Sequence, residues 1–223
     1  AHERRIRDIA EAAIKKAKKD IQVFATVDYY PVRKESHRTN TTIVEAYAAE
    51  PSRKTLENIE KALQEAGTDF DLRIMASHGG TISIKANELA RTCVSGPIGG
   101  MIGAKYLAEQ LGLKNVACSD IGGTSFDIGL ITQGDLAINT SPDMARLVLS
   151  LPLVSMDTTG AGTGSFVRID PNYGNITLGP DSAGSRVGVC NPQGGIDTVT
   201  VSDCHVVLGL INPDNFIGGV IKL

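Results

Sequence analysis

The stretch SDIGGTSFDIGLI, residues 119–131, decides how this chain is interpreted. Two carboxylates, Asp120 and Asp127, stand seven residues apart and enclose a Gly-Gly pair and two hydroxyl side chains. Residues 115–120 predict a buried strand, and residues 126–132 predict a second strand. The segment between them is therefore the tip that joins two paired strands.

The composition of this tip is typical of an anion site. A Gly-Gly pair can turn successive N–H groups to one side, which makes a concavity that binds anions. Thr124 and Ser125 add hydroxyl donors beside Gly122 and Gly123. We therefore expect the tip to hold phosphate groups. The alternative is an ordinary glycine-rich turn whose aspartates satisfy nearby N–H groups, because short glycine motifs often match by chance.

The two carboxylates need a cation if phosphate binds beside them, since like charges repel. Mg²⁺ binds one or two carboxylates, keeps several waters and bridges to phosphate oxygens. We expect Asp120, at the end of the first strand, to hold this ion or to orient an attacking group. Asp127 then fixes the shape of the loop or faces the cation from behind.

The flanking sequence predicts alternating helices and strands, which is typical of an α/β layer arrangement. Glycines at 96, 99, 100 and 103 leave one side of a predicted helix bare, for close packing or for a ligand. The predicted helices cover residues 6–19, 40–49, 51–66 and 95–111, and the predicted strands cover residues 21–27, 72–76 and 136–139.

Composition changes near residue 92 and suggests two parts. Residues 1–92 carry 16 of the 22 Lys and Arg residues but three of the 24 glycines, whereas residues 93–223 have a net charge of 6 − 11 = −5. We expect an α/β segment over 1–92 and a glycine-rich lobe over 93–223.

The charge and the cysteine content of the chain indicate which partners and which cellular location to expect. The net charge of −3 implies neither a nucleic-acid nor a membrane partner, and no apolar stretch is long enough for a signal peptide or a membrane span. The four cysteines lie far apart, which favours reduced thiols and a cytoplasmic location.

The pattern D-x-G-G-T-x-x-D at residues 120–127 resembles the phosphate loop of the actin-like ATPase superfamily, whose domains have a ribonuclease H-like fold. More narrowly, the chain resembles the hydantoinase A/oxoprolinase family. Within this family, the residues Ser119, Ile121 and Phe126 in and beside the loop resemble those of beta subunits in the acetone carboxylase branch. The matching segments, in order, are 1–3, 38–42, 77–80, 95–97, 120–127, 159–165, 179–184, 201–203 and 212–216.

The resemblance implies a fold, an activity and partners. It implies an enzyme subunit that binds ATP and Mg²⁺ and phosphorylates a small carbonyl substrate or bicarbonate, within a hetero-oligomer of carboxylase subunits. The alternatives are a ring-opening hydrolase of hydantoins or oxoproline, and a non-catalytic assembly module. Family members carry a second such loop near their N-terminus, which is missing here. We therefore expect a fragment that binds ATP weakly and is inactive alone.

Two other segments have competing interpretations. The loop TTGAGTGS, residues 158–165, would place Gly160 and Gly162 near the nucleotide by resemblance, or it packs under the sheet. Cys204 and His205 are adjacent, and on a strand they would point to opposite faces, which argues against a joint catalytic role. We interpret the cysteines as structural thiols.

Overall fold

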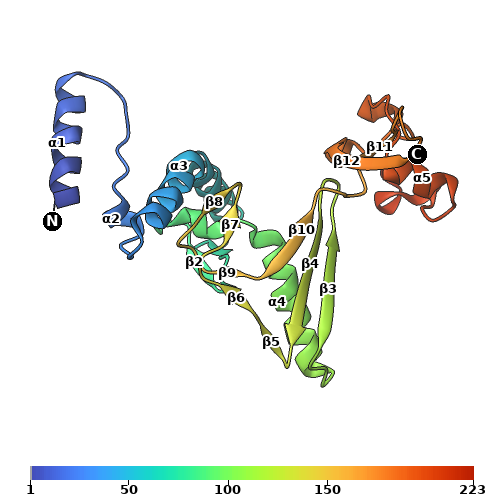
Figure 1. Ribbon diagram of the computed structural model, residues 1–223, viewed down its shortest axis with the longest axis horizontal. Helices are drawn as coiled ribbons and strands as arrows, with labels where there is room; N and C mark the ends of the chain where they lie inside the picture. Colours follow the sequence, from blue (N-terminus) through green and yellow to red (C-terminus); the bar gives the residue numbers. More distant parts are fainter. Residues whose placement is uncertain (1) are drawn as a thin grey trace. The chain divides into compact units, whose positions relative to one another are not determined.

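The computed structural model describes residues 2–223, without the side chains of residues 49 and 50. Ala1, which opens the first matching segment, lies outside the described residues. Backbone contacts divide the chain into two compact units (Figure 1). Unit 1 comprises the residues up to Leu113 together with Gly134–Ser155, and unit 2 comprises Lys114–Gln133 together with Met156–Leu223. This division does not coincide with the composition change at residue 92, and a lobe boundary there stays a prediction.

Unit 1 is mainly helical, with short strand pairs. Its β1 and β2 form one antiparallel hairpin, as do β7 and β8, while β6 pairs with β9. Its elements are α1 (His2–Lys16), α2 (Thr26–Tyr29), α3 (Glu35–Glu65), β1 (Arg73–Met75), β2 (Thr81–Ser83), η1 (Leu89–Thr92), α4 (Ser95–Gln110), β5 (Asp135–Leu136), β6 (Ile138–Asn139), β7 (Asp143–Met144), β8 (Leu147–Val148) and β9 (Leu153–Val154).

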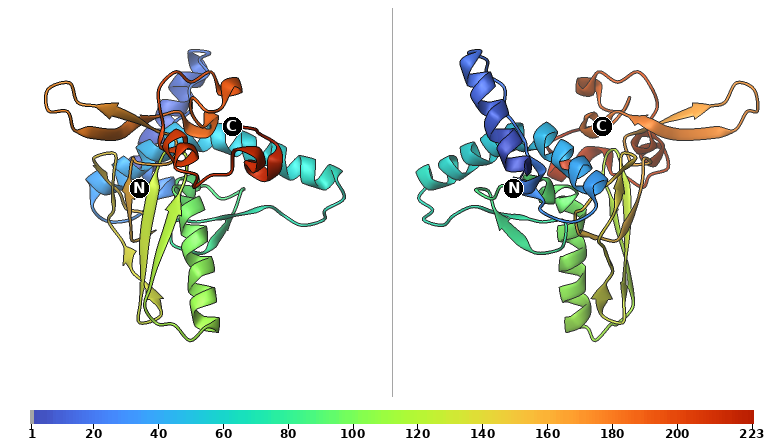
Figure 2. Two further views of the ribbon diagram at one scale, coloured as in Figure 1. Left: turned by 90° about the vertical axis from the view of Figure 1, so that its right-hand side faces the viewer. Right: turned by 60° about the vertical axis from the view of Figure 1, so that its left-hand side comes forward.

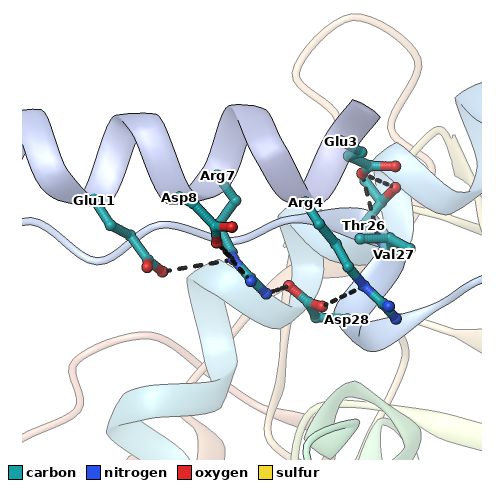
Figure 3. A network of polar contacts seen from close by, with 8 residues as sticks. All are labelled: Glu3, Arg4, Arg7, Asp8, Glu11, Thr26, Val27 and Asp28. Atoms are coloured by element: carbon teal, nitrogen blue, oxygen red, sulfur yellow. Dashed lines mark hydrogen bonds and ion pairs between the residues drawn. The ribbon is translucent and has the colours of Figure 1, made fainter. Parts of the chain in front are cut away.

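The first predicted helix is confirmed as α1, which is attached to α2 through polar side chains (Figure 3). Arg7 forms an ion pair with Asp28, and the Glu3 carboxylate accepts hydrogen bonds from the hydroxyl of Thr26 and the N–H of Val27. The side chains of Arg7 and Asp28 are 27% and 26% exposed, and ion pairs that water reaches each contribute little to stability. The orientation of α1 therefore depends on several weak contacts acting together.

Two predictions for the first 70 residues are wrong. Residues 21–25 form no strand, and α2 begins at Thr26. Ile21 is 61% exposed, and among the described residues no strand pairs with this segment.

The two helices predicted on either side of Pro51 are one continuous helix, α3. Proline removes one backbone donor and crowds the preceding turn, which predicts a break. Tertiary contacts hold the second half in line, because the guanidinium of Arg53 donates to the carbonyl oxygens of Ile84 and Ala86 at 2.8 and 2.9 Å.

A buried carboxylate organises the core of unit 1. Glu45 on α3 is fully buried and accepts hydrogen bonds from the Tyr30 hydroxyl at 2.8 Å and from the N–H groups of Leu89 and Ala90 at 3.0 and 2.8 Å. Burial and the neighbouring Glu45 carboxylate raise the pKa of Tyr30. Glu45 thus joins α3 to η1 and to the end of α2.

The glycine-rich helix is confirmed as α4, and the hairpin turn at 78–80 joins β1 to β2. Gly79 has φ +88°, and a Cβ there would lie 2.9 Å from Ile102 of α4. By contrast, within unit 1 no atom lies within 4 Å of a Cβ built at Gly96, Gly100 or Gly103. The described part of unit 1 therefore gives no packing reason for these helix glycines.

Unit 2 contains the antiparallel strands β10, β4 and β3, which are neighbours in that order, and a separate hairpin of β11 and β12, coloured orange in Figure 2. The sequence predicts the bounds of β4 correctly. The elements are β3 (Val116–Ile121), β4 (Phe126–Thr132), β10 (Met156–Thr159), β11 (Ser165–Ile169), β12 (Ile176–Ser182), η2 (Gly184–Arg186), η3 (Pro192–Gly194), α5 (Val201–Val207), η4 (Pro213–Asn215) and η5 (Ile217–Gly219).

Two predictions for unit 2 need correction. The strand β3 exists but is largely exposed, with Ile121 57% exposed, because β3 lies at the edge of the sheet and β4 at its centre. Cys204 and His205 lie on the helix α5 and not on a strand, so the argument from opposite strand faces does not apply.

Both units combine helices and strands, which confirms the α/β class. Among residues 2–223, none of the helices is both long enough and apolar enough to cross a bilayer.

We expect Glu45→Ala to lower the free energy of unfolding by about 3 kcal/mol, because it leaves two buried N–H groups and a buried hydroxyl without their acceptor. Urea denaturation measures this change. The matched control is Glu57→Ala, an exposed position on the same helix, and equal effects of the two substitutions would contradict the proposed role of Glu45.

Candidate functional site

The hairpin tip between β3 and β4 is a tight four-residue turn. The strands pair in register up to Ile121 and Phe126, and the N–H of Gly122 donates to the carbonyl of Ser125 at 2.9 Å. Gly123 and Thr124 therefore occupy the two central positions of the turn. Figure 1 shows this tip reaching the part of unit 2 that holds β11, β12 and α5.

The second glycine-rich loop, residues 160–164, packs directly against the tip. Three successive N–H groups of the loop donate to three successive carbonyl groups of the tip. The N–H groups of Gly162, Thr163 and Gly164 donate to the carbonyl oxygens of Thr124, Gly122 and Gly123 at 3.3, 2.9 and 2.8 Å. The two segments that the sequence singled out separately therefore form one structure.

These bonds determine where the N–H groups of the tip point. A trans peptide is planar, with its C=O and the following N–H directed to opposite sides. Since the carbonyls of residues 122–124 face the loop, the N–H groups of Gly123, Thr124 and Ser125 face away from it. Among the described residues none accepts a hydrogen bond from these three groups. Successive N–H groups on one side make an anion-binding concavity.

Close backbone contact explains why glycines are needed at this junction. A Cβ at Gly162 would lie 2.5 Å from the carbonyl oxygen of Gly122, and one at Gly123 would lie 2.9 Å from the carbonyl oxygen of Gly184. At Gly160 the nearest atom, Pro180 Cβ, is 3.9 Å away. Gly162 is therefore required by packing against the tip, whereas Gly160 is not.

The two aspartates have different surroundings although they share one face of the sheet. They are directly opposite in the β3–β4 register, which places both side chains on the same side. Asp127 is buried and accepts hydrogen bonds from the hydroxyls of Ser125 at 3.2 Å and Thr158 at 2.6 Å. The side chain of Asp120 is exposed and forms no hydrogen bond or ion pair with a described residue. Asp127 thus holds the tip, and Asp120 is free to bind.

The donor set fits a hydrated magnesium ion that is completed by phosphate. Within residues 2–223 no group of three or more His, Cys, Asp or Glu side chains could hold a metal by itself. Asp120 offers one exposed carboxylate, two residues before the start of the tip at Gly122. Mg²⁺ commonly binds through one or two carboxylates together with substrate phosphates and water, so the arrangement is compatible with it.

The segment 179–184 also reaches the tip, and sequence reasoning did not assign it to the site. The Ser182 hydroxyl donates to the Thr124 hydroxyl at 3.4 Å, and the backbone of Gly184 contacts Gly123. Gly179 and Gly184 both have φ of +58°. The sequence did offer a signal, because a glycine stands at each end of GPDSAG, residues 179–184, and glycine adopts such φ angles readily.

A second buried carboxylate, Asp203, anchors α5. It forms a capping box with Thr200 and accepts hydrogen bonds from the N–H groups of Val189 and Cys190 at 3.1 and 2.7 Å. Burial alone would raise the pKa of Asp203, but the hydrogen bonds from Cys190, Thr200 and Val189 prevail and lower it to about 2.

Three of the four cysteines do not resemble nucleophiles. Burial, together with Asp203, raises the pKa of the Cys190 thiol to about 11, and burial also raises the pKa of Cys93 and of Cys118. A nucleophilic cysteine needs a lowered pKa, because the thiolate is the reactive form. These three residues fit the interpretation as structural thiols.

Comparisons with known proteins identify the family. The hydantoinase/oxoprolinase family model matches residues 38–223. The chain is 69% identical to the acetone carboxylase beta subunit of Xanthobacter autotrophicus, covering 100% of this chain and 31% of that protein. It is 33% identical to the caprolactamase subunit alpha of Pseudomonas jessenii, covering 100% of this chain and 32% of that protein. The chain therefore belongs to the hydantoinase/oxoprolinase family.

Solved structures agree with this assignment. The nucleotide-free structure of acetone carboxylase superposes with a TM-score of 0.92 at 69% identity, over 100% of this chain and 31% of that chain. The ATP-dependent caprolactamase of Pseudomonas jessenii superposes with a TM-score of 0.72 at 31% identity, over 100% of this chain and 32% of that chain. The chain thus spans about a third of the length of these relatives.

We expect Gly162→Ala to lower the free energy of unfolding by about 2 kcal/mol or more, because the added methyl group collides with the backbone of the tip. Gly160→Ala is the matched control and should change it by less than about 0.5 kcal/mol. Urea denaturation of both variants tests this, and a tolerated Gly162→Ala would show that the loop does not pack on the tip as described.

The lowered pKa of Asp203 predicts a pH dependence. Because its folded-state pKa of about 2 lies below the unfolded value of about 3.9, its stabilisation is present at neutral pH and is lost as the pH falls through about 2. We expect Asp203→Asn to be less stable than the parent by about 2 kcal/mol at pH 7, with the difference narrowing below pH 4. Denaturation at several pH values measures this, and Asp197→Asn, an exposed position, serves as control.

Proposed function

We propose that this chain supplies a phosphate-binding part of an ATP-dependent enzyme that activates a small carbonyl compound or bicarbonate. The observation that supports the proposal is the hairpin tip, where the N–H groups of Gly123, Thr124 and Ser125 face outward without an acceptor among the described residues. A negatively charged phosphate satisfies such donors well, because charge-assisted hydrogen bonds are stronger than neutral ones. On this proposal the loop 160–164 supports the tip from behind.

Asp120 and Asp127 take separate roles in this proposal. Asp120 stands two residues before the tip with an exposed side chain and would hold a hydrated Mg²⁺ ion, which when bound neutralises phosphate charge. Asp127 keeps Ser125 and Thr158 in place through the two hydroxyl bonds that it accepts. We assign Asp127 a supporting role, because both oxygens are occupied and the side chain is buried.

The similarity to acetone carboxylase favours a carboxylase. The γ-phosphoryl group would pass from ATP, which leaves as ADP, either to the oxygen of the ketone's enolate after loss of an α-proton or to an oxygen of bicarbonate. The product would be an enol phosphate in the first case and carboxyphosphate, a mixed anhydride, in the second. The chain is twice as similar to the acetone carboxylase beta subunit as to caprolactamase subunit alpha, at 69% against 33% identity. A cyclic-amide hydrolase that uses the same phosphate site is the second candidate, because caprolactamase shares the fold over the whole chain.

The assembly is also part of the proposal. We infer an actin-like ATPase fold for the complete catalytic unit and a hetero-oligomer of subunits, since the relatives are named as subunits. Phosphoryl transfer needs groups on several sides of the nucleotide, and unit 2 provides one side. The isolated chain should therefore bind ATP weakly and turn it over poorly. A cytoplasmic location stays a prediction.

We expect Asp120→Asn to weaken binding of a non-hydrolysable ATP analogue about tenfold in the presence of Mg²⁺, because one carboxylate of the cation site is lost. Titration with a fluorescent analogue measures the dissociation constant. Without Mg²⁺ the substitution should have little effect or should improve binding, since a negative charge beside phosphate is removed.

Asp157→Asn is the matched control for this prediction. Asp157 is exposed on β10 opposite Ile128, so it lies on the other face of the same sheet and undergoes the same change of charge. Equal effects of the two substitutions would reject Asp120 as the cation ligand. Absence of binding, even by a chain extended to the length of the relatives, would favour an assembly module without nucleotide.

A further inference from the structure

Ser202, on the first turn of α5, makes two hydrogen bonds to one carbonyl group of the glycine-rich loop. Its N–H donates to the carbonyl oxygen of Thr163 at 2.8 Å, and its hydroxyl donates to the same oxygen at 3.0 Å. Ser202 is 4% exposed. The position of the Thr163 carbonyl is therefore defined by α5 through a single buried residue.

The hydroxyl of Ser202 is not needed to cap α5. The helix already has a capping box, in which the side chains of Thr200 and Asp203 each accept from the other's N–H. Capping satisfies the free N–H groups at the start of a helix and does not require a further hydroxyl at the second position. The bond to Thr163 therefore acts on the loop and not on the helix.

Two planar peptide groups carry this constraint to the tip. The peptide that joins Thr163 to Gly164 has its C=O held by Ser202, and its N–H donates to the carbonyl of Gly123 at 2.8 Å. The carbonyl of Gly123 belongs to the peptide group that joins Gly123 to Thr124. Since this carbonyl faces the loop, the N–H of the same peptide group, which is that of Thr124, faces outward. Hydrogen bonds in such a series also polarise one another.

Thr163 strengthens the same connection at a second point. Its N–H and its hydroxyl both donate to the carbonyl of Gly122, at 2.9 and 3.3 Å. Thr163 thus donates twice to one carbonyl oxygen, as Ser202 does, but the acceptor of Thr163 lies in the tip itself. The peptide that follows Gly122 ends in the N–H of Gly123, which is the first of the three outward donors.

We propose that Ser202 is a positioning residue for the phosphate-binding tip, acting through the peptide groups of Thr163–Gly164 and Gly123–Thr124. This inference rests on the proposed function, because it assigns a role toward phosphate to the outward N–H of Thr124. Without the Ser202 hydroxyl the loop peptide can rotate, and the three donors of the tip no longer keep a common direction.

The test compares Ser202→Ala, Ser202→Thr and the parent chain in two measurements, at a temperature where denaturation curves show all three to be folded. The first is amide hydrogen exchange at Thr163 and Gly164. The second is the dissociation constant for the fluorescent ATP analogue with Mg²⁺. We expect Ser202→Ala to speed exchange and to weaken binding, each about tenfold, and Ser202→Thr, which keeps the hydroxyl, to restore both.

A double-mutant cycle with Thr163→Val tests the shared route. Since both hydroxyls act on the same peptide segment, the effects of Ser202→Ala and Thr163→Val on binding should not add. Ser185→Ala, which removes an exposed hydroxyl of the same unit, is the control and should change neither measurement.

The outcomes separate this inference from the proposed function. Unchanged exchange at Thr163 and Gly164 in Ser202→Ala overturns the positioning role, whatever the nucleotide does. Faster exchange with unchanged nucleotide binding also overturns it. If the parent chain and its extended form bind no nucleotide, the proposed function fails, and the role of Ser202 toward phosphate fails with it. Faster amide exchange at Thr163 and Gly164 in Ser202→Ala would in that case still establish the mechanical link from α5 to the loop.

Discussion

The site depends on three hydrogen bonds between the loop 160–164 and the tip of the β3–β4 hairpin. They point the carbonyls of residues 122–124 toward the protein, and peptide planarity then points the next N–H groups outward. A hairpin turn of two central residues has no intrinsic reason to choose this orientation. The common direction of these N–H groups is thus a property of the pair of segments, and neither segment has it alone.

Glycine content follows from the same constraint. Backbones that exchange hydrogen bonds over three successive residues approach closely, so Gly162, Gly123 and Gly164 meet other backbone atoms where a Cβ would stand. The concentration of glycine after residue 92 therefore has two origins. Some glycines allow close approach, as at residue 162, and others adopt a positive φ, as Gly179 and Gly184 do.

The relatives act on different compounds, and the segment shared with them is about a third of each chain. Acetone and caprolactam have in common a carbonyl group that is poorly reactive in water. On the proposed function, the tip serves phosphoryl transfer, which is the same for both kinds of substrate. On the proposed function, the choice of substrate belongs to other parts of the enzyme.

The sequence by itself determined the hairpin, the bounds of β4, the helices α1 and α4, and the separation of Asp120 from Asp127, because these follow from local periodicity and turn chemistry. It could not determine that α3 continues through Pro51, since distant contacts from Arg53 decide this. For the helix at residues 201–207 a local signal existed, because Thr200 and Asp203 stand at capping-box spacing, and the contacts from the 187–191 loop to Asp203 add to it. Tertiary structure alone decided the surroundings of the two aspartates, because only the fold brings Thr158 to Asp127 and leaves the Asp120 carboxylate without a partner among the described residues.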